Sequence, residues 1–175
     1  DPLWQSMQAD EITERDYWLQ RSRETGALIG QNWDSMQQFV RAARGADPAA
    51  IIRPEALEII ERAKNSGTKL AILSNELDLF YGRDFRDRLP FLAWFDLIVD
   101  ATYTKVLKPD RKAYKLVEAG LNLPPSSLIL VDDQRRNIAG AKKAGWHTVL
   151  FDVQNPRTSY AQAQALLDTP DKKIQ

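Results

Sequence analysis

The sequence predicts an α/β fold: a three-layer, Rossmann-like parallel sheet that carries a small helical cap. From about residue 50 onward, short apolar segments alternate with helical segments of about a dozen residues, a pattern typical of βαβ units. The short segments are apolar at consecutive positions, as expected for strands that are covered by helices on both faces. The earlier part of the chain shows only helical patterns, which indicates a separate helical region.

The helical region, residues 12–45, predicts two helices. Thr13 is a suitable N-cap, and Asp16 three positions later completes a short capping box. The second helix is expected near residues 32–43, where aromatic and aliphatic side chains recur at helical spacing. We assign residues 1–48 to the cap.

The α/β region predicts four strands, at residues 69–74, 97–100, 127–133 and 147–152. Helices are expected between them, at residues 53–67, 108–120 and 134–146. The first two of these helices begin with proline and end near glycine, which is the usual asymmetry of helix ends. Segment 76–95 is expected to be irregular, because Gly82 and Pro90 interrupt its helical pattern. We assign residues 49–153 to an α/β core and residues 154–175 to a C-terminal helix and tail.

The composition excludes several functional classes. Hydrophobic residues make up 43% and charged residues 27% of the chain, and the formal net charge is zero. This balance is ordinary for a globular domain and indicates neither nucleic acid nor an anionic membrane as a partner. The absence of cysteine excludes disulfides, a thiolate nucleophile and cysteine-ligated metals. We therefore expect a cytoplasmic protein.

Polar residues stand where the predicted strands end. The first strand ends at Ser74 and Asn75, the third ends at Asp132 and Asp133, and Lys108 precedes the helix after the second strand. In open parallel sheets, ligands bind beyond the carboxyl ends of the strands. Each feature alone also fits a turn, a solvated lysine or an acidic helix start, but together they indicate a site.

The chemistry of this set points to a metal and a phosphoryl group. Adjacent carboxylates repel one another unless a cation compensates them, and hard oxygen ligands suit Mg²⁺. Asn137, one helical turn after the acidic pair, adds an amide to this end of the sheet. A lysine and a hydroxyl at neighbouring strand ends would neutralise and hydrogen-bond a phosphate.

Three segments, AILSN, LKPDRKAY and LILVDDQRRNIAGAKKAGW, resemble three motifs of the haloacid dehalogenase (HAD) superfamily. The resemblance covers about residues 50–153. It implies that Ser74 hydrogen-bonds the substrate phosphoryl group with support from Asn75, and that Lys108 stabilises the charge on the nucleophile and the phosphate.

The same resemblance assigns the metal site. Asp133 would be the Mg²⁺ ligand, and Asp132 and Asn137 would lie in supporting positions. The family's remaining motif, DxDx[TV], carries the nucleophilic and acid/base aspartates, and we find no counterpart of it in this chain.

The missing motif has a structural consequence. In the family its strand lies between the strands that end here at Ser74 and Asp132. We therefore expect this first central strand to be absent from the chain and to be supplied by an upstream segment or by another chain. Without it, two inner strands would lose backbone partners. Direct pairing between those two strands would contradict the expectation.

The resemblance implies a hydrolase, and the acidic pair favours a Mg²⁺-dependent phosphatase that acts on a small phosphate ester through an aspartyl-phosphate. The chain alone would lack the nucleophile and would be inactive. Two alternatives stay open. One is a 2-haloacid dehalogenase, which in this family needs no metal and usually lacks the acidic pair. The other is a non-catalytic HAD-like module.

Overall fold

The computed structural model describes most of the chain: residues 1–9, 11–44 and 47–169. This part has the predicted α/β fold and forms two compact units. The first unit contains residues 1–51 and 78–88, and the second contains residues 52–77 and the described chain from residue 89 onward. The compact units group the segment 78–88 with the helical region. The proposed boundaries at residues 48 and 153 stay predictions.

The secondary-structure elements in the described residues of the first unit are all helices. Its elements are α1 (Pro2–Gln8), α2 (Glu14–Leu28), α3 (Met36–Arg44), the 3-10 helix η1 (Pro48–Ile51), most of α5 (Leu77–Tyr81) and the 3-10 helix η2 (Arg83–Arg88). The capping box of α2 is confirmed, because the Thr13 hydroxyl accepts a hydrogen bond from the Asp16 N–H and the Asp16 carboxylate accepts one from the Thr13 N–H. Helix α1, which the sequence pattern did not predict, is capped by the Asp1 carboxylate.

The second unit contains the four predicted strands, β1 (Ala71–Ser74), β2 (Leu97–Asp100), β3 (Ile129–Asp132) and β4 (His147–Leu150). Its helices are α4 (Pro54–Asn65), α6 (Ala101–Thr104), α7 (Arg111–Leu121), α8 (Arg135–Lys143) and α9 (Pro156–Leu167), with the 3-10 helices η3 (Pro90–Trp94) and η4 (Pro125–Ser127). The irregular segment 76–95 is confirmed as three short helical pieces, α5, η2 and η3. The short helix α6 was not predicted.

The strands form two separate parallel pairs. β1 pairs with β2 so that Ser74 lies beside Asp100, and β3 pairs with β4 so that Asp132 lies beside Leu150. Within the described residues, no backbone hydrogen bond joins β1 to β3. All of β1 is only half-buried, and Val131 in β3 is 39% exposed.

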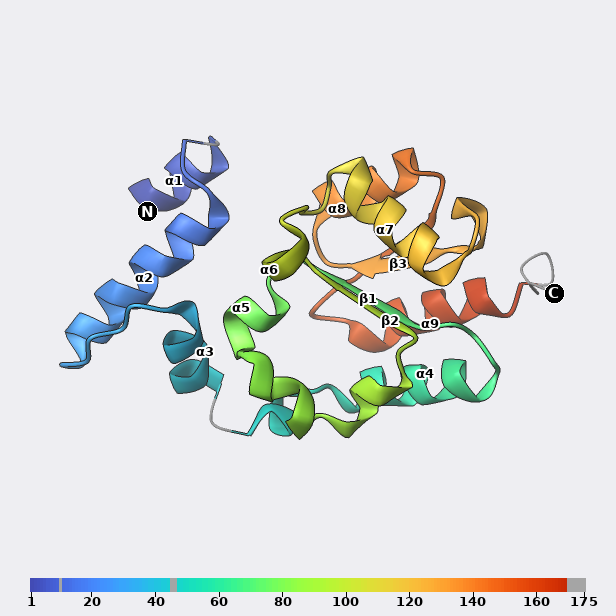
Figure 1. The fold of residues 1–175 in the computed structure, drawn as a ribbon, viewed down its shortest axis with the longest axis horizontal. Helices are drawn as coiled ribbons and strands as arrows, with labels where there is room; N and C mark the ends of the chain where they lie inside the picture. The colour runs from blue at the N-terminus through green and yellow to red at the C-terminus, as the bar shows by residue number, and fades with distance from the viewer. Residues whose placement is uncertain (10, 45–46, 170–175) are drawn as a thin grey trace. The chain divides into compact units, whose positions relative to one another are not determined.

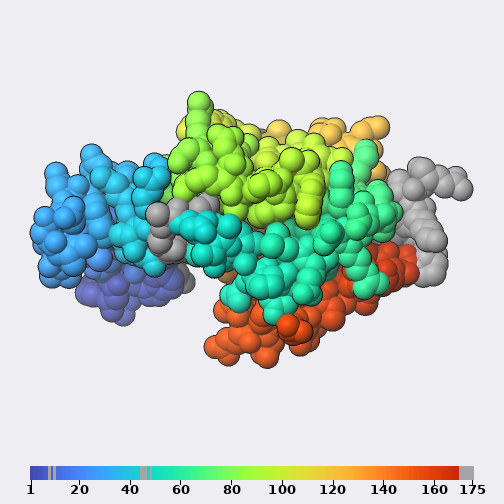
Figure 2. Space-filling view, turned by 90° about the horizontal axis from the view of Figure 1, so that it is seen from below, coloured from blue at the N-terminus to red at the C-terminus, as the bar shows by residue number. Residues whose placement is uncertain are grey.

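Helices cover the strands on two sides, which gives the second unit its three layers. Figure 1 shows α7 and α8 on one side and α4 and α9 on the other. Figure 2 shows α4 and α9 at the surface, where Arg157 of α9 donates to Glu55 of α4 at 3.2 Å. The core lies mainly between the strands and the α7–α8 layer and includes Val99, Tyr114 and Trp146. No helix in the described part of the chain is long and apolar enough to cross a bilayer.

Candidate active site

All six residues predicted for the site belong to the second unit and lie at the carboxyl ends of its strands or in the segments that follow. Ser74 is the last residue of β1, and Asp132 is the last residue of β3. The two ends lie near one another, because Lys108 bonds to Asn75, next to Ser74, through its backbone and to Asp132 through its Nζ. Lys108 reaches these ends from the loop between α6 and α7.

Ser74 forms a turn and keeps part of its hydrogen-bonding capacity. Its Oγ accepts a hydrogen bond from the Glu76 N–H at 3.2 Å, as serine often does where a strand ends. Within the described residues, no acceptor is found for the Ser74 hydroxyl hydrogen. A serine hydroxyl can donate one bond while it accepts another, so this residue is both a turn residue and an available donor.

Asn75 connects the end of β1 to the backbone of Lys108. Its Oδ1 accepts the Lys108 N–H at 2.8 Å, and its Nδ2 donates to the Lys108 carbonyl at 3.1 Å. The two residues are 33 positions apart in the sequence. The side-chain amide therefore fixes a loop backbone that no sheet ladder or helix holds.

Lys108 and Asp132 form a buried ion pair. The distance from Nζ to Oδ2 is 2.6 Å, and the two side chains are 10% and 6% exposed. The second carboxylate oxygen, Oδ1, accepts the Gln134 N–H at 2.8 Å and the Asn137 amide at 3.0 Å. A buried carboxylate needs this level of compensation, because an unpaired buried charge is strongly destabilising.

Asp133 has the opposite environment. It is exposed, and the described part of the chain provides no hydrogen bond or ion pair to its carboxylate. Successive strand residues point to opposite faces, and the two acids diverge in this way as the strand ends. Of the two, Asp133 is the carboxylate that remains available to a ligand.

Asn137 and Tyr114 lie behind the carboxylates. Asn137 is 2% exposed, and its backbone carbonyl accepts the Tyr114 hydroxyl at 2.8 Å. Its Oδ1 is buried without a hydrogen-bond partner in the described chain. Burial, and then the charge on Asp132, raises the pKa of Tyr114 to about 12, so the phenol stays a hydrogen-bond donor at ordinary pH.

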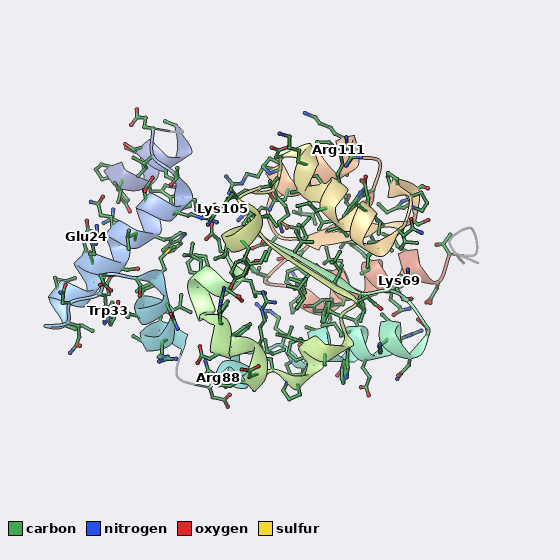
Figure 3. All side chains as sticks on the ribbon, in the orientation of Figure 1. Glu24, Trp33, Lys69, Arg88, Lys105 and Arg111 are labelled. Atoms are coloured by element: carbon green, nitrogen blue, oxygen red, sulfur yellow. The ribbon has the colours of Figure 1, made fainter. Side chains whose placement is uncertain are left out.

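Two of these supporting residues were missed by the sequence analysis as parts of the site. Tyr114 appeared only within a motif, although a tyrosine on the apolar face of a helix indicates a buried hydroxyl that needs a partner. Gly140 likewise appeared only within a motif. A Cβ added at Gly140 would lie 2.6 Å from the Tyr114 hydroxyl oxygen and 2.8 Å from Pro109 Cβ. Figure 3 shows Arg111 at the start of the helix that carries Tyr114.

The donor set fits a Mg²⁺ site that other groups would complete. Among the described residues, no three His, Cys, Asp or Glu side chains cluster around a common point. Mg²⁺ usually binds one or two carboxylates together with water and substrate phosphate oxygens. Asp133 supplies an available carboxylate, and the unpartnered Asn137 Oδ1 supplies a neutral oxygen. The oxygens of Asp132 already accept hydrogen bonds from Lys108, Gln134 and Asn137.

Comparisons with known proteins agree on one protein family. Residues 6–145 match the haloacid dehalogenase-like hydrolases. Acyl-CoA dehydrogenase family member 10 from Mus musculus is 31% identical over 67% of this chain and 11% of its own length. Ribulose-1,5-bisphosphate 5-phosphatase from Halopiger xanaduensis is 33% identical over 57% of this chain and 41% of its own. (S)-2-haloacid dehalogenase 4A from Burkholderia cepacia is 29% identical over 61% and 46%, respectively.

Solved structures support the same fold. The magnesium-bound HAD-hydrolase YfnB from Bacillus subtilis superposes with a TM-score of 0.67 and 18% identity, over 96% of this chain and 78% of that structure. The chain spans between 11% and 58% of the length of the first three curated relatives. The family match covers most of the chain, and the three-layer fold agrees with it. The chain therefore belongs to the haloacid dehalogenase-like hydrolases.

Proposed function

We propose that the protein is a Mg²⁺-dependent phosphatase that acts on a small phosphate ester. The observation that carries this proposal is the pairing of Lys108 with Asp132 while the adjacent Asp133 stays exposed and unpaired. This arrangement leaves a second carboxylate for a cation beside a fixed ammonium group. The relatives that are named as phosphatases support the same choice.

The predicted side chains other than Asn75 then have roles in binding the phosphate or the metal, or in placing a residue that does. The Ser74 hydroxyl would donate to a phosphoryl oxygen, and the Lys108 ammonium would offset the negative charge that the phosphate brings to the site. Asp133 would hold the Mg²⁺, with Asn137 in a supporting position. When bound, this ion supplies charge stabilisation to the phosphoryl group. Asp132 would keep Lys108 in place, although its predicted role as a metal ligand stays a prediction.

The nucleophile is proposed to come from an additional strand between β1 and β3. Three observations support this position: within the described residues β1 and β3 each pair on one side only, β1 is half-buried, and Val131 is exposed. Helix-covered parallel sheets normally bury such strands and pair their inner edges. An aspartate at the end of that strand would attack phosphorus to give an aspartyl-phosphate, and the ester oxygen would leave with a proton from an acid group.

A dehalogenase is the second candidate, because one relative carries that name. A dehalogenase has no need of a second carboxylate beside the Lys108–Asp132 pair. Asp133 therefore favours the phosphatase. The third possibility, a non-catalytic module, requires that no nucleophile accompany the chain.

The decisive experiment uses the intact protein that contains this chain. We expect phosphate release from p-nitrophenyl phosphate that requires Mg²⁺ and stops when EDTA is added. Asp133→Ala should remove the response to Mg²⁺, whereas Asp110→Ala, which changes an exposed helix cap, should retain it. Chloride release from a 2-haloacid without metal would overturn the proposal in favour of a dehalogenase, and inactivity toward both substrate classes would favour the module.

A further inference from the structure

We infer that Asn75 is a positioning residue that acts through Lys108 and that it is not primarily a substrate ligand. This inference rests on the proposed function for its catalytic consequence, but the geometry stands without it. Asn75 directs Oδ1 and Nδ2 to the N–H and carbonyl of the same residue, Lys108. A two-point attachment of this kind fixes both the place and the rotation of the backbone at Lys108.

The Lys108 backbone needs such an anchor because of its place in the chain. It lies in the loop after α6, before α7 begins at Arg111, and it is followed by Pro109, which has no N–H to donate. Leu107, immediately before it, is 38% exposed and therefore provides limited packing. The Asn75 amide takes over the anchoring role that packing or a hydrogen-bond ladder would have elsewhere.

The far end of the Lys108 side chain is fixed separately. A lysine ammonium is a point charge on a flexible stem of four carbons, so its location depends on both ends. Asp132 holds Nζ at 2.6 Å, and Asn75 holds the backbone from which the stem starts. Asn75 therefore fixes the start of the Lys108 side chain, and Asp132 fixes its charged end.

The anchor also couples two groups that are proposed to meet the phosphate. Ser74 precedes Asn75 directly at the end of β1, so one amide sets the separation between the serine hydroxyl and the lysine ammonium. A misplacement of about 1 Å in such a pair can lower a rate by roughly a hundredfold. Asn75 would thus contribute to the rate even where it does not touch the substrate.

A chemical test needs no enzyme activity. The intact protein and its Asn75→Ala variant are labelled with acetic anhydride, and the rate at each lysine is read by mass spectrometry. Labelling of Lys108 should rise about tenfold in the variant, the scale expected when two hydrogen bonds are lost. The exposed Lys112 and Lys115 should not change, and neither should Lys108 in the control Asn65→Ala, which alters an exposed asparagine of α4.

A kinetic cycle then separates positioning from substrate binding. In single-turnover assays, Asn75→Ala should lower the rate of phosphate release by about tenfold to a hundredfold with little change in substrate affinity. In a Lys108→Met background, Asn75→Ala should have almost no further effect, because a residue that acts through another is not additive with it. Additive losses, or a loss confined to affinity, would overturn the inference.

The labelling experiment tests the anchor independently of the proposed function, whereas the kinetic cycle depends on it. If the intact protein releases no phosphate, the phosphatase assignment fails, while the labelling result still tests the anchor. Unchanged labelling of Lys108 in Asn75→Ala would overturn the anchor itself. Should Asn75→Ala not fold, Asn75→Asp retains the acceptor for the Lys108 N–H and should give an intermediate labelling rate, whereas a wild-type rate would contradict the inference.

Discussion

Two partly buried polar networks lie near helix α7, and they differ in which polar atoms they leave without a partner. The first joins Asn75, Lys108, Asp132 and Asn137 at the carboxyl ends of the strands. The second joins Arg111, Glu118 and Trp146: Arg111 Nη2 donates to Glu118 Oε2 at 3.0 Å, and Trp146 Nε1 donates to Glu118 Oε1 at 2.8 Å. We call the first the site network and the second the brace.

In the brace the carboxylate is fully paired, although Arg111 Nη1 lacks a hydrogen bond within the described residues; the site network instead leaves a side-chain oxygen unpaired. Both carboxylate oxygens of Glu118 have partners, and the Trp146 ring packs edge-on against Tyr114 at 5.4 Å. The site network, by contrast, contains Asn137 Oδ1, which has no partner among the described residues, and it adjoins the exposed Asp133. A carboxylate whose two oxygens are both paired stabilises a fold, while the unused oxygens at the site network are what supports the proposed ligand site.

The largest effect is expected when the site network is broken at its ion pair. Lys108→Met leaves the Asp132 carboxylate buried without its cation, which costs about 3–5 kcal/mol of unfolding free energy. Urea unfolding of the intact protein followed by circular dichroism measures this loss. In the double variant Lys108→Met with Asp132→Leu, both charges are removed and most of the stability should return. A double variant as unstable as Lys108→Met would contradict this account.

The next effect tests how closely α8 approaches the residues behind the site. Gly140→Ala should destabilise the protein by about 1–3 kcal/mol, because the new Cβ would lie 2.6 Å from the Tyr114 hydroxyl and 2.8 Å from Pro109 Cβ. Adding Tyr114→Phe should restore part of the loss. Thermal unfolding measures both variants.

Gly120→Ala is the matched control for Gly140→Ala. Its added Cβ would meet Leu97 Cδ2 at 2.6 Å, but this is the flexible end of a side chain that can turn away. In a helix, alanine is favoured over glycine by about 1 kcal/mol, so Gly120→Ala should be close to neutral. Equal losses at the two glycines would show that the contact with Tyr114 and Pro109 has no special role.

The sequence predicted the strands, and where polar residues end them, better than it predicted the contacts that hold these residues in place. Strand ends are visible as apolar segments that stop at Ser74 or Asp132, and the capping box at Thr13 is a local signal. The bond from Asn75 to the Lys108 backbone is different, because it joins residues 33 positions apart and only the three-dimensional fold brings them together. The opposite environments of Asp132 and Asp133 likewise depend on which face of the strand end is covered.

A smaller effect comes from the brace and depends on pH. Burial by itself would raise the pKa of Glu118, but the hydrogen bonds from Arg111 and Trp146 outweigh it and hold the pKa below its usual value. A carboxyl whose folded pKa is lowered adds stability above its unfolded pKa, near 4.3, and this stability is lost as pH falls through the folded pKa. Glu118→Gln should therefore reduce stability by about 1–2 kcal/mol at pH 7.

A series of stability measurements at different pH values tests the role of the Glu118 charge. The stability difference between the protein and Glu118→Gln should shrink progressively as the pH is lowered from about 6 to 3, because the carboxyl becomes neutral in both states. Urea unfolding at each pH measures the difference. Glu61→Gln alters an exposed acid of α4 and should show little dependence on pH. If the stability difference for Glu118→Gln grew as the pH was lowered, this account of the Glu118 carboxylate would be wrong.

The smallest effect distinguishes the two ends of α8, of which only one lies beside the site network. Arg135 and Arg136 occupy its first turn, where the helix dipole disfavours cations, whereas Lys142 and Lys143 occupy its last turn, where the dipole favours them. Replacing the two arginines by glutamine should leave stability unchanged or raise it by about 0.5 kcal/mol, and replacing the two lysines should lower it by a similar amount. Both double variants change the net charge equally, so differential scanning calorimetry at low salt isolates position. Equal shifts in both variants would mean that overall charge, and not the dipole, governs this helix.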